Sequence, residues 1–136
     1  ETNYKFSSID FPIFRLPEMY LIYAEADARL NGGNVSDETA KGYIRQLRQR
    51  AGVDATTPSI MDLNWLLDER ARELMWEGHR RVDLIRYGLF TSMQFPWTLK
   101  GGVPNGKIAL PEFRTIYPII ISDLNANPKL VQNPGY

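Results

Sequence analysis

The sequence contains no cysteine, one histidine and no excess of charge of either sign. Without cysteine, this chain forms no disulfide, no thiolate metal site and no cysteine nucleophile. Sixteen basic and sixteen acidic residues give a formal net charge of zero. No long-range field therefore attracts the chain to phosphate backbones or anionic lipid. We expect neither nucleic-acid binding nor direct binding to a membrane surface.

Long apolar runs are also missing. A helix that crosses a bilayer needs roughly 20 apolar residues. The densest apolar run, Ile116 to Ile121, is far shorter and contains Pro118. The chain opens with Glu1 and shows no charged segment followed by an apolar one, as an export signal would. We therefore expect a fragment or processed product of a longer protein, whose targeting signals would lie elsewhere.

Apolar periodicity in the first two thirds of the chain predicts helices. The first is expected from Leu16, with Pro17 in its first turn, to a stop at Asn31-Gly32-Gly33. The second is expected to be capped by Ser36 and to end at Gly52. The apolar stripe expected on the first helix is Leu16, Met19, Tyr20, Tyr23 and Leu30, and that on the second is Ala40, Tyr43, Ile44, Leu47 and Ala51.

A third helix is predicted after Asp62, which is placed to cap it. Gly78 predicts a bend, an end or a close helix contact, because glycine costs about 1 kcal/mol in a helix interior relative to alanine. A shorter helical segment is expected from Arg81 to Phe90. The expected buried face of the third helix is Leu63, Leu66, Leu67, Ala71, Leu74 and Met75.

The last part of the chain, residues 91–136, has a different composition. It holds six of the nine prolines, and proline disfavours long helices. We expect an irregular tail that wraps over the helices, with one short turn begun by Ser122. The first two helices together span Leu16 to Ala51, close to the repeat of about 34 residues in tetratricopeptide units. The fold class predicted is all-α: one domain over 1–136, with a tetratricopeptide-like hairpin and further helices over 15–90.

Four strings, in order, resemble the SusD/RagB family of outer-membrane nutrient-binding lipoproteins. The strings are Arg15–Ala26 (RLPEMYLIYAEA), Leu47–Val53 (LRQRAGV), Leu67–Leu74 with Glu77–Gly88 (LDERAREL and EGHRRVDLIRYG), and the C-terminal set Tyr117–Ile119, Leu124–Pro128 and Gln132–Tyr136. The match covers residues 15–136 and corresponds to the C-terminal portion of the family.

The resemblance implies a function that composition does not. Family members are lipid-anchored on the outer face of the outer membrane, where they cover a SusC-like TonB-dependent transporter and bind glycans or other oligomeric nutrients for import. They are not enzymes and need no cofactor. The lipid anchor would lie in an N-terminal part absent from this sequence and would be the only membrane contact. This segment would act mainly as a scaffold.

The densest cluster of charge runs from Asp68 to Arg86. Glu69, Glu73 and Glu77 lie at i, i+4 spacing, and paired carboxylates can act as acid and base in glycoside hydrolysis. That chemistry needs two carboxyls on opposite sides of a bond, which one helical stripe does not provide. We therefore expect a structural ion-pair network. The expected pairs are Asp68 with Arg72, Glu77 with Arg80 or Arg81, and Asp83 with Arg86.

The single histidine and the tryptophans are the remaining candidates for a site. His79 has no second histidine to share a metal, so we expect a helix-end residue at the core boundary and no metal site. Trp65 and Trp76 are expected to pack. Trp97, beside Phe95 in the tail, is the candidate for stacking on a sugar ring, although burial under the tail is the simpler role.

Two rivals to the transporter-associated role remain open. The first is a helical-repeat adaptor that binds a protein or peptide in its groove, because tetratricopeptide-like pairing alone fits both functions. The second is a glycoside-active enzyme, which would need a cleft with opposed carboxyls. The four strings favour the nutrient-binding protein. Neither the ligand nor its contact residues follow from the sequence.

Overall fold

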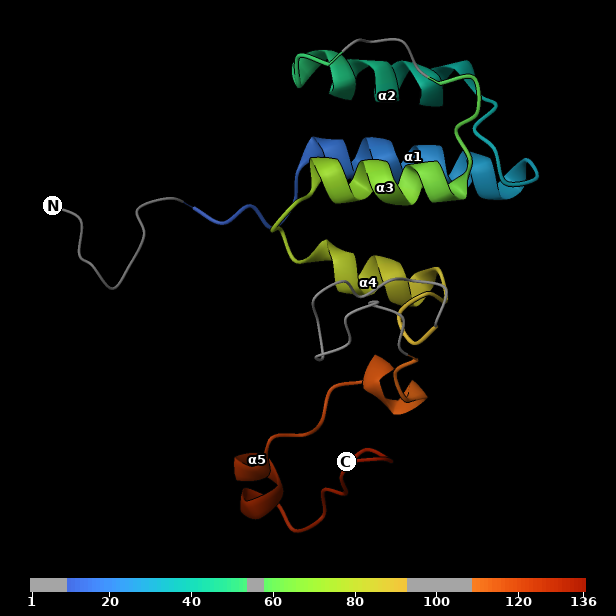
Figure 1. The fold of residues 1–136 in the computed structure, drawn as a ribbon. Coiled ribbons are helices and arrows are strands. Elements are labelled where there is room, and N and C mark those ends of the chain that lie inside the picture. The colour runs from blue at the N-terminus through green and yellow to red at the C-terminus, as the bar shows by residue number, and fades with distance from the viewer. Residues whose placement is uncertain (1–9, 54–57, 93–108) are drawn as a thin grey trace, which may run out of the picture. The chain divides into compact units, whose positions relative to one another are not determined.

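The computed structural model describes residues 10–53, 58–92 and 109–136, and every regular element in these ranges is a helix (Figure 1). The predicted all-α class is confirmed. No helix in these ranges is both long and apolar enough to cross a membrane. The elements in chain order are α1 (Leu16–Leu30), α2 (Glu38–Arg50), α3 (Leu63–Glu73), α4 (His79–Arg86), the 3₁₀ helix η1 (Glu112–Thr115) and α5 (Ile121–Ala126).

Helix α1 begins and ends where the sequence predicts. Proline stands in its first turn, where its missing N–H costs no hydrogen bond. At the other end, the Asn31 amide group donates to the Asp27 carbonyl at 2.9 Å. Gly32 and Gly33 then take φ of 71° and 95°, values that glycine adopts without the steric cost that other residues bear. The chain therefore turns back sharply after α1.

Helix α2 is capped by Asp37, not by Ser36. The Asp37 side chain accepts from the Thr39 backbone N–H at 3.2 Å. Ser36 is engaged elsewhere, because its backbone N–H donates to the Asp27 carboxylate at 2.6 Å. Burial favours a raised pKa for Asp27, but the N–H groups of Asp37 and Ser36 outweigh it and lower the pKa. Asp27 thus fixes the turn between the first two helices.

Helix α3 begins as predicted and ends earlier than expected. The Asp62 side chain accepts from the Trp65 backbone N–H at 2.8 Å. The helix stops at Glu73, and the chain passes through positive φ at Trp76 (67°) and Gly78 (83°) before α4 starts. The interruption predicted at Gly78 is confirmed. The shorter helix begins at His79 and ends at Arg86, and so does not reach Phe90.

The chain divides into two compact units, residues 1–80 and 81–136, with the division inside α4. In the first unit, α1 packs against both α2 and α3 (Figure 1). Three alanines in this core let the helices approach closely, and the Tyr20 and Tyr43 rings stack with centroids 4.2 Å apart. The buried core residues are Leu21, Ala24, Ala28, Val35, Ala40, Ile44, Leu47, Met61, Leu66 and Leu74.

The buried face of α1 is not the face that the sequence predicted. Leu21, Ala24 and Ala28 are fully buried, whereas Leu16 is 61% and Leu30 85% exposed. The helix has apolar residues on two sides, and the larger side chains suggested the wrong one. On the other two helices the prediction is largely right, since Ala40, Ile44, Leu47, Leu66, Leu67 and Leu74 are buried. Ala51 and Met75 are exceptions and lie exposed.

The second unit contains only short helices in its described part, as the proline content predicted, and α5 begins at Ile121, next to the expected Ser122. Its last five residues hold the segment after η1. The Gln132 side chain bonds both the N–H and the C=O of Ile119, at 2.8 and 2.9 Å. The Tyr136 hydroxyl donates to the Ile116 carbonyl at 2.7 Å. Wrapping of this tail over the helices stays a prediction.

Candidate functional site

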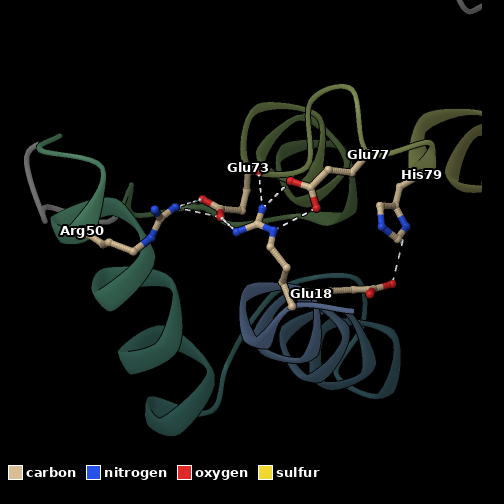
Figure 2. A network of polar contacts seen from close by, with 6 residues as sticks. Glu18, Arg50, Glu73, Glu77 and His79 are labelled. Atoms are coloured by element: carbon tan, nitrogen blue, oxygen red, sulfur yellow. Dashed lines mark hydrogen bonds and ion pairs between the residues drawn. The ribbon is translucent and has the colours of Figure 1, made fainter. Parts of the chain in front are cut away.

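A polar cluster in the first unit brings together Arg50, Glu73 and Glu77 (Figure 2), and Arg15 is at its centre. It directly precedes α1 and reaches the end of α3. Its guanidinium donates to both carboxylate oxygens of Glu77, at 2.9 and 2.6 Å. It also bonds Glu73, at 3.1 Å to the carboxylate and 2.8 Å to the backbone carbonyl. From the other side, Arg50 of α2 donates to the Glu73 carboxylate at 2.7 Å. The cluster therefore connects the start of α1 and the ends of α2 and α3.

The bonds of Arg15 bias the protonation of the groups it joins. The hydrogen bond from Arg15 holds the pKa of the Glu77 carboxyl below its usual range. The same bond raises the pKa of the Arg15 guanidinium further above neutrality. Charge-assisted, two-pronged contacts of this kind are stronger than neutral hydrogen bonds and fix geometry. These contacts favour the charged forms of Arg15 and Glu77 and hold the start of α1 against the end of α3.

Ion pairs between carboxylates and arginines are present in this region, but most of them join other residues than the sequence suggested. Asp83 and Arg86 lie 2.9 Å apart, as the local spacing suggested. Arg72 contacts Glu69 at 2.6 Å instead of Asp68, because Glu69 is on the packed side of α3 and Asp68 is exposed. Glu77 takes Arg15, not Arg80 or Arg81, because α3 has ended before it and the turn points it toward α1.

Arg80 and Arg81 are adjacent in the chain, but each makes its contacts within a different unit. Arg80 donates to the Leu67 carbonyl at 2.8 Å and lies 3.8 Å from Asp68. Arg81 donates to the carbonyls of Arg114 and Thr115 at 2.7 and 3.2 Å. Its guanidinium also lies 4.0 Å from the centroid of the Tyr117 ring, within cation–π range. Both arginines hold main-chain segments in place.

The three carboxylates that could suggest glycoside hydrolysis do not all lie on α3, and each of them is bonded to an arginine. Glu69 accepts from Arg72 and lies 3.5 Å from Arg48, and Glu73 and Glu77 share Arg15 (Figure 2). Glu77 lies beyond the end of α3, so the expected stripe of three is broken. Each of the three carboxylates is bonded to arginine. This arrangement orders helices.

A groove of about 450 Å³ lies beside this cluster, between α2 and α3. Its apolar floor is aliphatic and its walls are the ion pairs already described. It offers no aromatic face for stacking on a sugar ring. The lining residues are Leu47, Arg48, Ala51, Val53, Glu69, Arg72 and Glu73.

His79 begins α4 and lies with its Nδ1 3.5 Å from the Glu18 carboxylate of α1 (Figure 2). This agrees with the expected place at a helix end and core boundary. Among the residues that the structure describes, no group of three or more potential ligands is arranged to hold a metal ion.

The tryptophans differ in their surroundings. Trp65 packs against the core, as expected. The expectation that Trp76 packs is wrong within the described residues, since its side chain is 91% exposed. The early end of α3 and the positive φ at Trp76 place it on the outside of the turn. Trp97, the sequence candidate for sugar stacking, lies outside the described residues.

Sequence reasoning missed the two residues that organise the first unit, Arg15 and Asp27. Arg15 is 62 positions from Glu77, and no local pattern pairs residues at such a separation. Asp27 sits inside a helix, where nothing in its spacing announces a bond to the turn nine residues later. The nearest signal is the short loop between Gly33 and Ser36, whose backbone donors need a partner.

A helical hairpin with a third helix stacked on it defines a helical-repeat scaffold of the tetratricopeptide type. A sequence model of the SusD family matches residues 1–136. The starch-binding protein SusD of Bacteroides thetaiotaomicron is 42% identical over 127 residues, which cover 93% of this chain and 22% of that protein. The chain belongs to the SusD/RagB family.

Two further comparisons agree. SusD-like protein P25 of Formosa agariphila is 33% identical over 134 residues, covering 91% of this chain and 24% of that protein. A crystal structure of a SusD homologue from Bacteroides thetaiotaomicron superposes with a TM-score of 0.63 at 29% identity, covering 90% of this chain and 26% of that one. The chain thus spans about a quarter of the length of these relatives.

Proposed function

We propose that this chain is the C-terminal scaffold of a glycan-binding lipoprotein on the bacterial cell surface. The observation that carries the proposal is the family match over the whole chain, together with 42% identity to a starch-binding protein. The relatives are about four times longer, so the complete binding site would draw on residues outside this segment. The ligand class proposed is a glycan, and a starch-type glucan is the first to test.

The partner proposed is a SusC-like TonB-dependent transporter in the outer membrane, which imports the captured glycan. This part of the proposal rests on the resemblance of the four sequence strings to the family. The anchor would be a lipid outside this segment. In such an assembly, a rigid helical unit keeps the ligand-binding loops in register with the transporter.

A scaffolding role fits what the charged residues do in the first unit. The guanidinium of Arg15 bonds Glu73 and Glu77, and Arg80 bonds a main-chain carbonyl. These side chains bond other groups of the same unit, so they support its structure more than the capture of a ligand. The same bonds argue against catalysis, because an acid–base pair must face a substrate bond from two sides.

The test is glycan binding by the lipoprotein that carries this segment, measured by calorimetry on a panel headed by maltooligosaccharides. We expect saturable binding without turnover. Trp97→Ala should weaken binding several-fold if its ring stacks on sugar, with Trp76→Ala as the matched control on an exposed tryptophan. Binding to no glycan, or release of new reducing ends, would contradict the proposal. Unchanged affinity in Trp97→Ala would remove Trp97 alone.

A further inference from the structure

The end of α1 carries an asparagine followed by a glycine, a chemically reactive pair. The sequence contains this pair twice, at Asn31-Gly32 and at Asn105-Gly106, and the second lies outside the described residues. The glycine nitrogen, which has no neighbouring side chain to hinder it, can attack Cγ of the asparagine. The nitrogen loses its proton as the N–Cγ bond forms, and the Cγ–Nδ2 bond breaks to release ammonia. Water then opens the cyclic imide to aspartate or isoaspartate.

The structure holds the Asn31 side chain through two hydrogen bonds to Asp27. Its Nδ2 atom donates to the Asp27 carboxylate at 2.7 Å and to the Asp27 backbone carbonyl at 2.9 Å. These bonds use both hydrogens of the amide. The backbone is held too, because the N–H of Gly33 donates to the Ala28 carbonyl at 2.8 Å. The side chain must therefore break two hydrogen bonds before it can turn toward Gly32.

The backbone angle at Asn31 also opposes ring closure. A five-membered ring needs Cβ of Asn31 and the nitrogen of Gly32 on the same side of the Cα–C bond. With ψ at 43°, the L configuration at Cα places them on opposite sides of this bond. Asn31 is exposed to water, but both its side chain and its backbone must change before the reaction can start.

Deamidation would disrupt the turn between α1 and α2. The Asp27 carboxylate also accepts from the backbone N–H groups of Ser36 and Asp37, at 2.6 and 3.0 Å. A second carboxylate at position 31 would place an oxygen where Nδ2 now lies, and two carboxylates that share a site destabilise each other's charged form. The isoaspartate product also adds one carbon to the main chain just before Gly32. Either product breaks contacts that end α1.

We propose that Asn31 is a site of spontaneous deamidation, and that its bonds to Asp27 and the backbone at the end of α1 keep this reaction slow in the folded protein. The reaction then proceeds through local opening of the turn, and the free energy of that opening sets its rate. It requires no ligand and no enzyme, so the proposal is independent of the proposed function.

The test follows deamidation at both pairs by peptide mapping with mass spectrometry. The full-length protein that carries this segment is incubated at mildly alkaline pH, folded and in urea. Asp27→Ala removes an acceptor of the Asn31 amide. Asp37→Ala is the matched control, because it removes the carboxylate that caps α2 and leaves the acceptors of that amide in place. Asn105-Gly106 in the same digests is the reference when folded variants are compared.

We expect Asn31 to deamidate at least about tenfold more slowly in the folded parent than in urea, because two hydrogen bonds must break first. Asp27→Ala should raise the folded rate several-fold, and Asp37→Ala should leave it close to that of the parent. A folded rate equal to the rate in urea would overturn the proposal. Equal acceleration by Asp27→Ala and Asp37→Ala would also overturn it.

A second measurement keeps the proposal testable if Asp27→Ala does not fold. Asn31→Asp reproduces the aspartate product, whereas Asn31→Ala removes the same hydrogen bonds without adding a charge. Thermal unfolding should give a lower Tm for Asn31→Asp than for Asn31→Ala. A Tm that is equal or higher in Asn31→Asp would contradict the disruption of the turn by the product.

Discussion

At the scale of single residues, Arg15 makes the largest contribution to holding the first unit together. One guanidinium bonds two carboxylates and a main-chain carbonyl at the end of a helix more than 50 residues away. The carboxylates are largely buried. Removing the arginine would leave Glu77 without its two-pronged donor and Glu73 with Arg50 alone, which costs more than the loss of an exposed ion pair.

Arg15→Ala should therefore lower the free energy of unfolding by about 1.5–3 kcal/mol, as expected for hydrogen bonds to charged groups. Arg45→Ala is the matched control, because its pairing with Glu38 is long, at 3.8 Å, and exposed. That change should stay within about 0.5 kcal/mol. Urea unfolding of both variants checks this, and equal losses would show that the bonds of Arg15 add nothing beyond a surface pair.

The residue scale is also where sequence predicts least. The i, i+3 pair of Asp83 and Arg86 was predictable, because a helix brings such residues together. The long-range partners of Glu73 and Glu77 were not, because they depend on how α1 meets α3. Spacing proposes candidate pairs, and packing then decides which are made.

At the scale of elements, helix ends were predictable because their causes are local. Asp62 and the glycines after Asn31 act through bonds and dihedral angles within a few residues. The buried face of α1 was not, since this helix has two apolar sides and the smaller residues face the core. Ser36 is not the cap because α2 begins at Glu38, directly after Asp37, and the Ser36 hydroxyl instead donates to the Asp27 carboxylate at 3.3 Å.

Leu74 gives the test of this packing. It closes α3 and clusters with Leu21 and Leu47. Leu74→Ala should cost about 2–5 kcal/mol, and the same holds for Leu67→Ala. Met75→Ala, one residue further along and 62% exposed, should change stability by less than about 0.5 kcal/mol. A small loss at Leu74, measured by urea unfolding, would show that α3 presents a different face to the core.

The C-terminal clasp gives a second test. A Cβ on Gly135 would lie 2.5 Å from the Phe113 ring, and its φ is 95°. Gly135→Ala should therefore cost about 2 kcal/mol or more, from the clash and the strained backbone together. Gly88→Ala adds the strain alone, since nothing lies within 4 Å of its added carbon, and should cost about 1 kcal/mol.

Hydrogen exchange of the Ile119 amide reports on this clasp, because that amide donates to Gln132. Exchange should speed up markedly in Gly135→Ala and stay close to the parent rate in Gly88→Ala. Similar rates in both variants would mean that the last residues do not hold the segment after η1.

At the scale of the whole molecule, the sequence predicted the fold class because local and long-range signals agree. Three amphipathic segments with caps predict helices, and four family strings in register predict how they assemble. The extent of the ligand site was not predictable, since the chain spans about a quarter of its relatives. The proposed role as a scaffold is consistent with the helical unit and with its charged side chains, which bond one another.

The most direct test of that account is recovery of the partner. The full-length protein that carries this segment is affinity-tagged, solubilised from outer membranes with mild detergent and analysed for proteins that co-purify in stoichiometric amounts. The account predicts a TonB-dependent transporter in near-equal amount. Recovery of the protein alone, or with a soluble protein in place of the transporter, would contradict it and favour a helical-repeat adaptor.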